Sequence, residues 1–438
     1  MIRSRLATLR YVASAIFWLI ALVCCIEVVL QGRSLYRSAE QRESVDEATV
    51  LVPSAQIGQS LKPLTRHNVT HPDGPTRVSW STNSLGLRGP EWPLPKPPGV
   101  FRVLCLGDEN ILAPETANGE TACDQLQALL QTRTRYRVEV INGGVPGYCP
   151  LLCYLLIRHR LIALQPDVVV LNFDMSDVAD DHRHRPFAII GSDGIPVACS
   201  SALKETRRPP SKALFDRFEL ARLGKSQLEQ LLPKGGGASD TRDIDAPEGA
   251  YAWLADDPPD WSVYIRQALA PIEHLRALTA GLRIHCLLAT YPVPWQVSSK
   301  ASSAPGVRRS AGVPSSALYS SRAPFELLAS FSTHHQIPFL DTSSAFQAAR
   351  QPERLFLRNS PRFSPQGHEF YAQQLSTFIV SQVPGVWTNS SVPPRQLPTA
   401  GNTQVRHASQ NQAERLVRPP AVPMLRRAPD MPQISNPR

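Results

Sequence analysis

The stretch FRVLCLGDENILAP, residues 101–114, contains the residue types and spacing best suited to chemistry. A run of apolar residues typical of a buried strand ends in a tight turn at Gly107 and Asp108. The next position is one where a nucleophile could sit, and Glu109 occupies it. Most ester chemistry does not use a carboxylate as its nucleophile, so the stretch has the form of a nucleophile turn without the attacking group.

A second polar run follows another apolar stretch and extends from Asp174 to His184. Its carboxylates and imidazoles are Asp174, Asp177, Asp180, Asp181, His182 and His184. Groups of this kind bind divalent ions, which keeps a metal site open as one interpretation. Just after a strand, however, such residues are more often solvated or cap the next helix, so we predict no metal and no cofactor.

The elements that must position these residues alternate along the chain from residue 101. Strands are predicted at 101–107, 136–143, 166–173, 283–292 and 337–343, and helices at 119–133, 149–164, 261–281, 323–335 and 367–383. This alternation predicts an α/β fold, a three-layer α/β/α sandwich with a parallel sheet. Residues 182–250 are expected to form an insertion over the carboxyl edge of the sheet, with a hairpin that turns at Asp193 and Gly194.

Four blocks in this order resemble the SGNH, or GDSL, ester-hydrolase family. They are GDE at 107–109, NGGVPGY at 142–148, PDVVVLNFDMSD at 166–177 and SPRFSPQGH at 360–368. The stretch NSLGLRGPEW at 83–92 is similar to the segment that precedes them in many membrane-anchored bacterial members. The resemblance covers residues 83–382 and implies a flavodoxin-like sheet whose site lies at the carboxyl ends of the strands.

In that family a Ser attacks the ester, and a His oriented by an Asp removes its proton. Backbone N–H groups and an Asn side chain hold the oxyanion. Matched residue by residue, the Ser, Asn, Asp and His positions are Glu109, Ser176, Ser360 and Arg362, whereas the oxyanion glycine is kept as Gly147 with Gly144 nearby. The resemblance therefore implies a hydrolase-like domain in which the catalytic side chains are replaced.

The replacements allow three interpretations of the site. If the fold holds, Glu109 and Arg362 are neighbours, and we expect an ion pair that fills the vacated space. Alternatively, Asp108, Glu109, Asp177, Arg362 and His368 bind a ligand, or Glu109 acts as a general base. His368 itself lies on the closing helix, where packing or capping is the commoner role and a base is the alternative.

Two function classes follow from these interpretations. The favoured class is a catalytically inactive SGNH-like protein that binds a ligand or acts as a scaffold at the cell envelope, with an unknown protein partner. The alternative is an active ester or acyl hydrolase, of carboxylesterase or O-acyl esterase type, with a non-standard site.

The domain organisation is predicted from hydropathy and composition. After a short segment at 1–10, residues 11–30 are apolar except for Ser14 and Glu27 and are long enough to cross a membrane. A cleaved signal peptide is the main alternative, but no A-x-A site follows the run. We therefore predict a single-pass membrane protein with an extracytoplasmic spacer at 31–98, a domain at 99–382 and a disordered tail at 383–438.

Charge and cysteine content limit the partners. The tail supplies +5 of the formal net charge of +9, so it could bind anionic lipid or wall polymer. The rest of the chain has no basic, aromatic-interleaved patch, which argues against nucleic acid. The eight cysteines show no CxxC or zinc spacing, and buried free thiols are favoured over a disulfide.

Overall fold

The computed structural model describes residues 50–201 and 249–387, together with Ser14, Trp18, Leu22 and Val29. The predicted membrane helix at 11–30 lies outside the described residues except for these four positions, as do residues 202–248 of the insertion and almost all of the tail. Within the described ranges, no helix combines the length and apolar character that a membrane span requires.

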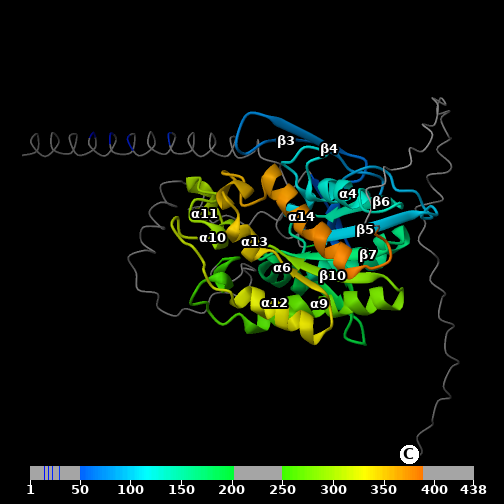
Figure 1. The fold of residues 1–438 in the computed structure, drawn as a ribbon. Coiled ribbons are helices and arrows are strands. Elements are labelled where there is room, and N and C mark those ends of the chain that lie inside the picture. The colour runs from blue at the N-terminus through cyan, green and yellow to red at the C-terminus, as the bar shows by residue number, and fades with distance from the viewer. Residues whose placement is uncertain are drawn as a thin grey trace, which may run out of the picture. The chain divides into compact units, whose positions relative to one another are not determined.

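A five-stranded parallel sheet forms the centre of the domain (Figure 1). Its strands are β5 (Val100–Gly107), β6 (Arg137–Gly144), β7 (Val168–Phe173), β10 (His285–Thr290) and β11 (Phe339–Asp341). They lie in the order β11-β10-β7-β5-β6. Numbered along the chain this order is 2-1-3-4-5, the flavodoxin-like arrangement, which places the ligand site where the order reverses.

Helices cover both faces of the sheet, which confirms the predicted three layers (Figure 1). One face packs against α4 (Ala122–Gln131), α13 (Ser343–Ala348) and α14 (Pro365–Gln382), and the other against α5 (Pro150–His159), α6 (Asp177–His184), α9 (Ser262–Gly281) and α12 (Ala323–His334). Strand β5 is buried throughout because it is covered on both faces. Val103 and Cys105 pack in the core beneath α4, α13 and α14, whereas Leu104 and Leu106 pack in the core on the other face, since successive side chains alternate between faces.

Short elements connect these layers. They are α3 (Glu109–Leu112), α10 (Pro294–Val297), α11 (Pro305–Ser310) and the 3-10 helices Leu161–Leu164, Arg185–Phe187, Ala252–Leu254 and Pro352–Leu355. The predicted hairpin of the insertion is confirmed as β8 (Ala188–Ile190) paired antiparallel with β9 (Pro196–Cys199).

Residues 51–81, within the segment 31–98 that was predicted to be an extended spacer, instead form two hairpins that belong to the domain. These are β1 (Leu51–Ser54) with β2 (Gly58–Leu61), and β3 (Arg66–Thr70) with β4 (Arg77–Ser81). Their side chains Leu61 and Trp80 are buried in the core, and Trp80 Nε1 donates to the carbonyl of Pro114 at 3.0 Å. Burial of large apolar groups holds these hairpins on the domain, so the segment is structural rather than a linker.

The described cysteines are free thiols, as predicted: Cys105, Cys123, Cys149, Cys153, Cys199 and Cys286. Burial raises the pKa of the Cys149 and Cys153 thiols well above the ordinary value. A thiol must lose its proton to act as a nucleophile, so these two side chains act as small core residues.

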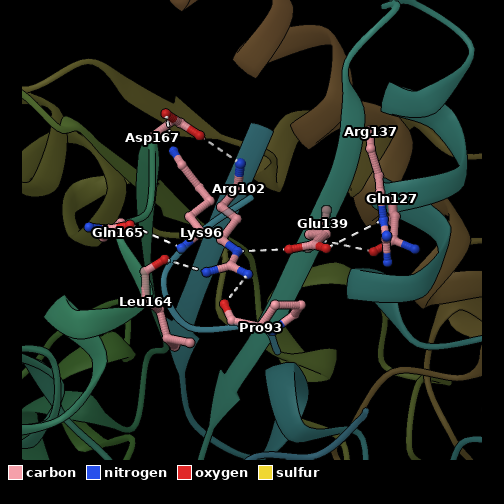
Figure 2. Close-up of polar contacts among 10 residues, drawn as sticks. Pro93, Lys96, Arg102, Gln127, Arg137, Glu139, Leu164, Gln165 and Asp167 are labelled. Atoms are coloured by element: carbon pink, nitrogen blue, oxygen red, sulfur yellow. Dashed lines mark hydrogen bonds and ion pairs between the residues drawn. The ribbon is translucent and has the colours of Figure 1, made fainter. Parts of the chain in front are cut away.

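A buried ion pair fixes the amino end of the sheet. Arg102 in β5 is fully buried and its Nε donates to Glu139 Oε2 in β6 at 2.7 Å (Figure 2). Its two terminal nitrogens donate to the carbonyls of Leu164 and Pro93 at 2.7 and 2.8 Å. Because the guanidinium is surrounded by acceptors, the charge is tolerated inside the protein and ties four segments together.

Removing this guanidinium should be costly. We expect Arg102→Met to lower the free energy of unfolding by about 3–5 kcal/mol, since Glu139 would lose its buried partner. Urea unfolding of the full chain measures the change. Arg137, whose side chain is 57% exposed and 3.4 Å from Glu139, supplies the control, with an expected loss of about 0–1 kcal/mol for Arg137→Met. A loss below about 1 kcal/mol for Arg102→Met would contradict the assignment.

Candidate functional site

A cavity of about 300 Å³ lies at the carboxyl edge of the sheet, where the four sequence blocks meet. Its walls include a residue pair from each block: Asp108 and Glu109, Pro146 and Gly147, Asp174 and Ser176, and Pro361 and Arg362. The remaining lining residues are Leu51, Gln59, Asn110, Asp180, Arg183, His184, Tyr251 and Val293. The structure thus brings together most of the positions that the resemblance identified.

Glu109 occupies the nucleophile position and reaches across to the second block. The turn holds because Asp108 caps α3 by accepting the N–H of Asn110 at 3.1 Å. Glu109 Oε1 then accepts the backbone N–H of Gly147 at 3.2 Å. The resemblance assigns this N–H the role of donating to the oxyanion of an ester-hydrolysis transition state. Here it donates to the Glu109 carboxylate instead.

Arg362 does not form the predicted ion pair with Glu109. Its Nη1 binds Glu115 Oε1 instead, although Arg362 and Glu109 line the same cavity. The reason is a reversal of the backbone after α3, where Ala113 adopts a left-handed conformation with φ of 55°. The reversal brings Glu115 towards the fourth block, and its nearly buried carboxylate has the stronger need for a cation.

Asn110 connects three of the four blocks. Its Nδ2 donates to Asp174 Oδ2 at 3.2 Å, and its Oδ1 accepts the backbone N–H of Phe363 at 3.0 Å. A single buried amide therefore aligns the turn after β5 with the segments that follow β7 and precede α14.

Gly144 permits the close approach between the turn and β6. A Cβ at this position would lie 2.2 Å from the backbone nitrogen of Leu112 and 2.9 Å from the carbonyl oxygen of Asp108. No side chain fits such a distance. Gly144 therefore acts through packing, whereas Gly147 faces the cavity.

Carboxyl groups of the first and third blocks are buried beside the cavity. Asp174 accepts the backbone N–H of Ser176 at 2.8 Å, and Asp177 accepts that of Asp174 at 3.2 Å. Burial raises the pKa of Asp108 and of Asp177 well above the ordinary value, and the charge of Asp174 acts in the same direction on both. Asp177 lies behind the lining rather than in it.

Asp180 and Arg183 form a pair on the cavity wall. Arg183 Nη2 donates to Asp180 Oδ1 at 2.7 Å, one helical turn apart on α6. Burial raises the pKa of Asp180 to about 7, with Arg183 opposing the change and Glu109 and Asp174 adding to it. This carboxyl group therefore changes its charge close to neutral pH.

Two buried histidines lie in this region, and both are poor bases. Burial lowers the pKa of His184 to about 3, with the charge of Arg183 contributing and the Gly147 backbone opposing. Burial also lowers the pKa of His368 to about 3. His368 lies outside the cavity lining and packs edge-on against Phe363 at 5.5 Å between ring centres, so the packing role foreseen for it fits its position.

Ser360, at the position that the resemblance assigns to the orienting Asp, makes its hydrogen bonds away from the cavity. Its Oγ accepts the N–H of Arg362 at 3.4 Å, and its carbonyl accepts the hydroxyl of Ser302 at 2.8 Å. Ser360 lies outside the lining of the cavity and supports the loop before α14.

The alternative of a metal site between Asp174 and His184 finds no cluster to hold the ion. Among residues 50–201 and 249–387, no three His, Cys, Asp or Glu side chains converge as metal ligands. Asp181 shows where one of the candidate ligands goes, because Arg185 binds both of its oxygens at 2.5 and 2.8 Å.

Three contributors to the site carried no usable sequence signal. Glu115 lies in an irregular turn after α3, so neither helical nor strand periodicity relates it to Glu109. Gln59 comes from the segment predicted to be a spacer, and Tyr251 follows the insertion. His184 and Asp180 were visible only as members of a polar run. Their placement depends on α6, which turns both towards the cavity.

The pKa of Asp180 makes a pH-dependent prediction. A carboxyl whose pKa is raised on folding binds a proton more tightly in the folded chain, so its contribution to stability is lost as pH rises from 5 to 8. Asp180→Asn removes this contribution. We expect the wild-type chain to lose roughly 2–3 kcal/mol relative to Asp180→Asn over that range. Urea unfolding at several pH values provides the measurement, and parallel curves for the two proteins would refute the shifted pKa.

Comparisons with known proteins give distant structural similarities. No family model and no curated protein matches the chain. A lipolytic protein of the G-D-S-L family from Desulfitobacterium hafniense is similar over 64% of this chain and 99% of its own, with 13% identity and a TM-score of 0.32. A lipase/acylhydrolase from Enterococcus faecalis is similar over 68% of this chain and 100% of its own, with 12% identity and a TM-score of 0.34. An acetylxylan esterase from Geobacillus stearothermophilus is similar over 64% of this chain and 94% of its own, with 14% identity and a TM-score of 0.35.

Scores and identities this low carry no argument about activity. The interpretation of the fold rests instead on the strand order, the helices on both faces and the meeting of the four blocks at one edge. On those observations, the described domain has the three-layer α/β fold with flavodoxin-like strand order that the SGNH/GDSL resemblance predicts.

Proposed function

We propose that the protein is a catalytically inactive SGNH/GDSL-like protein that binds a ligand in the cavity at the carboxyl edge of its sheet. The observation that carries the proposal is the hydrogen bond from the Gly147 N–H to Glu109 Oε1. One residue thereby removes two requirements of ester hydrolysis, because the nucleophile is absent and the oxyanion donor is occupied.

Electrostatics support the same conclusion. A developing oxyanion near Gly147 would lie beside the Glu109 carboxylate, and like charges at such a distance raise the energy of a transition state. Arg362 cannot offset this charge fully, since it already binds Glu115. The cavity wall therefore disfavours the charge that ester hydrolysis must create.

Among the described residues, the site has no histidine of suitable strength as a general base, and Asp180, whose pKa is about 7, is bound to Arg183 and has no serine at position 109 to activate. A base works best when its pKa is near the operating pH, whereas the pKa of His184 is about 3. Arginine and serine at positions 362 and 360 do not remove protons under ordinary conditions. The cavity with its converging polar groups remains, and a concave site of this kind is suited to binding.

An esterase assay tests the proposal. We expect the full chain and Glu109→Gln to hydrolyse p-nitrophenyl acetate at the same background rate, because loss of the triad removes most of the rate acceleration and loss of an oxyanion donor a further ~10²–10³-fold. The exposed Glu120, outside the cavity, supplies the control variant Glu120→Gln. Turnover by the native chain that disappears in Glu109→Gln but not in Glu120→Gln would establish the alternative, an ester or acyl hydrolase with a non-standard site.

For location, we propose single-pass anchoring through residues 11–30, with the domain outside the cytoplasm and the basic tail near anionic lipid or wall polymer. The support is the length and apolar character of residues 11–30 and the charge of the tail. The full chain should stay with membranes after alkaline carbonate extraction, and a chain lacking residues 1–31 should be released. Release of both would contradict the anchor.

A further inference from the structure

On the walls of the cavity, several hydrogen-bond donors are already bound to acceptors in the protein, whereas carboxyl oxygens can accept further hydrogen bonds. We propose that the cavity binds a small organic ligand through a primary ammonium group, held by Glu109, Asp180 and the ring of His184. This inference rests on the proposed binding function and specifies the class of ligand.

Several of the donors that line the cavity already have acceptors within the protein. The amides of Gly147, Asn110 and Gln59 donate to Glu109, Asp174 and the carbonyl of Pro146, the last at 2.7 Å. Both guanidinium groups are paired, Arg183 with Asp180 and Arg362 with Glu115. A ligand that needs many donors would have to compete with these bonds.

Acceptor capacity is in excess by comparison. Asp108, Glu109, Asp174 and Asp180 all line the cavity, and each carboxylate can accept several hydrogen bonds. Only Arg183 and Arg362 among the described lining residues bring a permanent positive charge, and Arg362 is matched by Glu115 outside the lining. With Glu109 and Asp180 ionised at pH 8 against Arg183, the charge of the described lining is negative and favours a cation.

His184 independently indicates a missing donor. It is 1% exposed and lines the cavity, and among the described residues neither ring nitrogen makes a hydrogen bond of standard geometry, although the Gly147 backbone lies close enough to act on one of them. A buried polar group without a partner costs stability, and native proteins seldom keep one without a reason. Because the ring is neutral, one of its nitrogens is an acceptor, which an ammonium N–H would satisfy.

Size and surroundings make an organic cation a better fit than a metal ion. A volume of about 300 Å³ is at the lower end of small-molecule sites. Leu51, Pro146, Val293 and the ring of Tyr251 add apolar contact area to the wall. In the described part of the chain no metal-binding cluster accompanies the carboxylates, whereas an ammonium needs only three acceptors.

Three compounds that share one ring test the inference. Cyclohexylammonium, cyclohexanol and cyclohexanecarboxylate are titrated against the full chain at pH 8, where Asp180 is ionised, and binding is followed by saturation-transfer NMR. We expect the ammonium to bind with a Kd of about 1 mM or lower and at least about tenfold more tightly than the alcohol. The carboxylate should bind most weakly.

Variants locate the binding. Glu109→Gln and Asp180→Asn should each weaken ammonium binding by about tenfold or more and leave the alcohol unaffected, whereas Glu120→Gln should change neither. Tighter binding of the carboxylate, equal binding of ammonium and alcohol, or no ammonium binding at about 10 mM would each overturn the inference. None of these outcomes resembles Glu109-dependent ester turnover, which would overturn the proposed function instead.

Discussion

The geometry of the carboxyl edge depends on Asn110, whose amide is shared between separate parts of the chain. It donates to Asp174 after β7 and accepts from the backbone of Phe363 before α14, while its own N–H is bound by Asp108. The order of strands brings these segments near one another, but it does not set their spacing. A buried amide with its hydrogen bonds satisfied sets the spacing, because each lost bond would leave a desolvated polar group.

This alignment has an electrostatic consequence. Holding the turn against the segment after β7 gathers the carboxyl groups of Asp108, Asp174 and Asp177 in a region with little water. A neutral Ser at position 109 would add no charge there, whereas Glu109 adds a further carboxylate. The Gly147 N–H donates to this added carboxylate and so stabilises its charge. Glu109 therefore needs the same donor that an oxyanion would use. Under the proposed function, the absence of a nucleophile at position 109 and the occupation of the Gly147 N–H are therefore physically coupled.

Much of the fold could be predicted from the sequence because β7 and its neighbours are short, continuous apolar runs that only a sheet covered on both faces can bury. The positions of Glu109, Gly147, Ser176 and Arg362 around one cavity followed from the order of the blocks. The partner of Arg362 could not be predicted, because a single left-handed residue, Ala113, decides where Glu115 lies.

The amino-terminal hairpins were missed for a different reason. Strands of four or five residues with few apolar positions do not differ from turn-rich linker in periodicity, and their stability comes from tertiary contacts such as that of Trp80 with Pro114. Yet the contacts of these hairpins reach the site itself. Asp73, in the turn between β3 and β4, accepts the N–H groups of Arg358 and Asn359 at 2.7 Å and so holds the segment that leads to Arg362.

The cavity is therefore built by more of the chain than the replaced catalytic residues alone would require. Gln59 from β2 donates to Pro146 beside Gly147, and Tyr148 in turn donates to the carbonyl of Gln59 at 2.6 Å. Desolvated carboxyl groups and the buried polar ring of His184 reduce stability, and packed apolar residues in their place would not. Local violations of this kind concentrate where a protein needs them for function, which supports the proposal that this cavity binds a ligand.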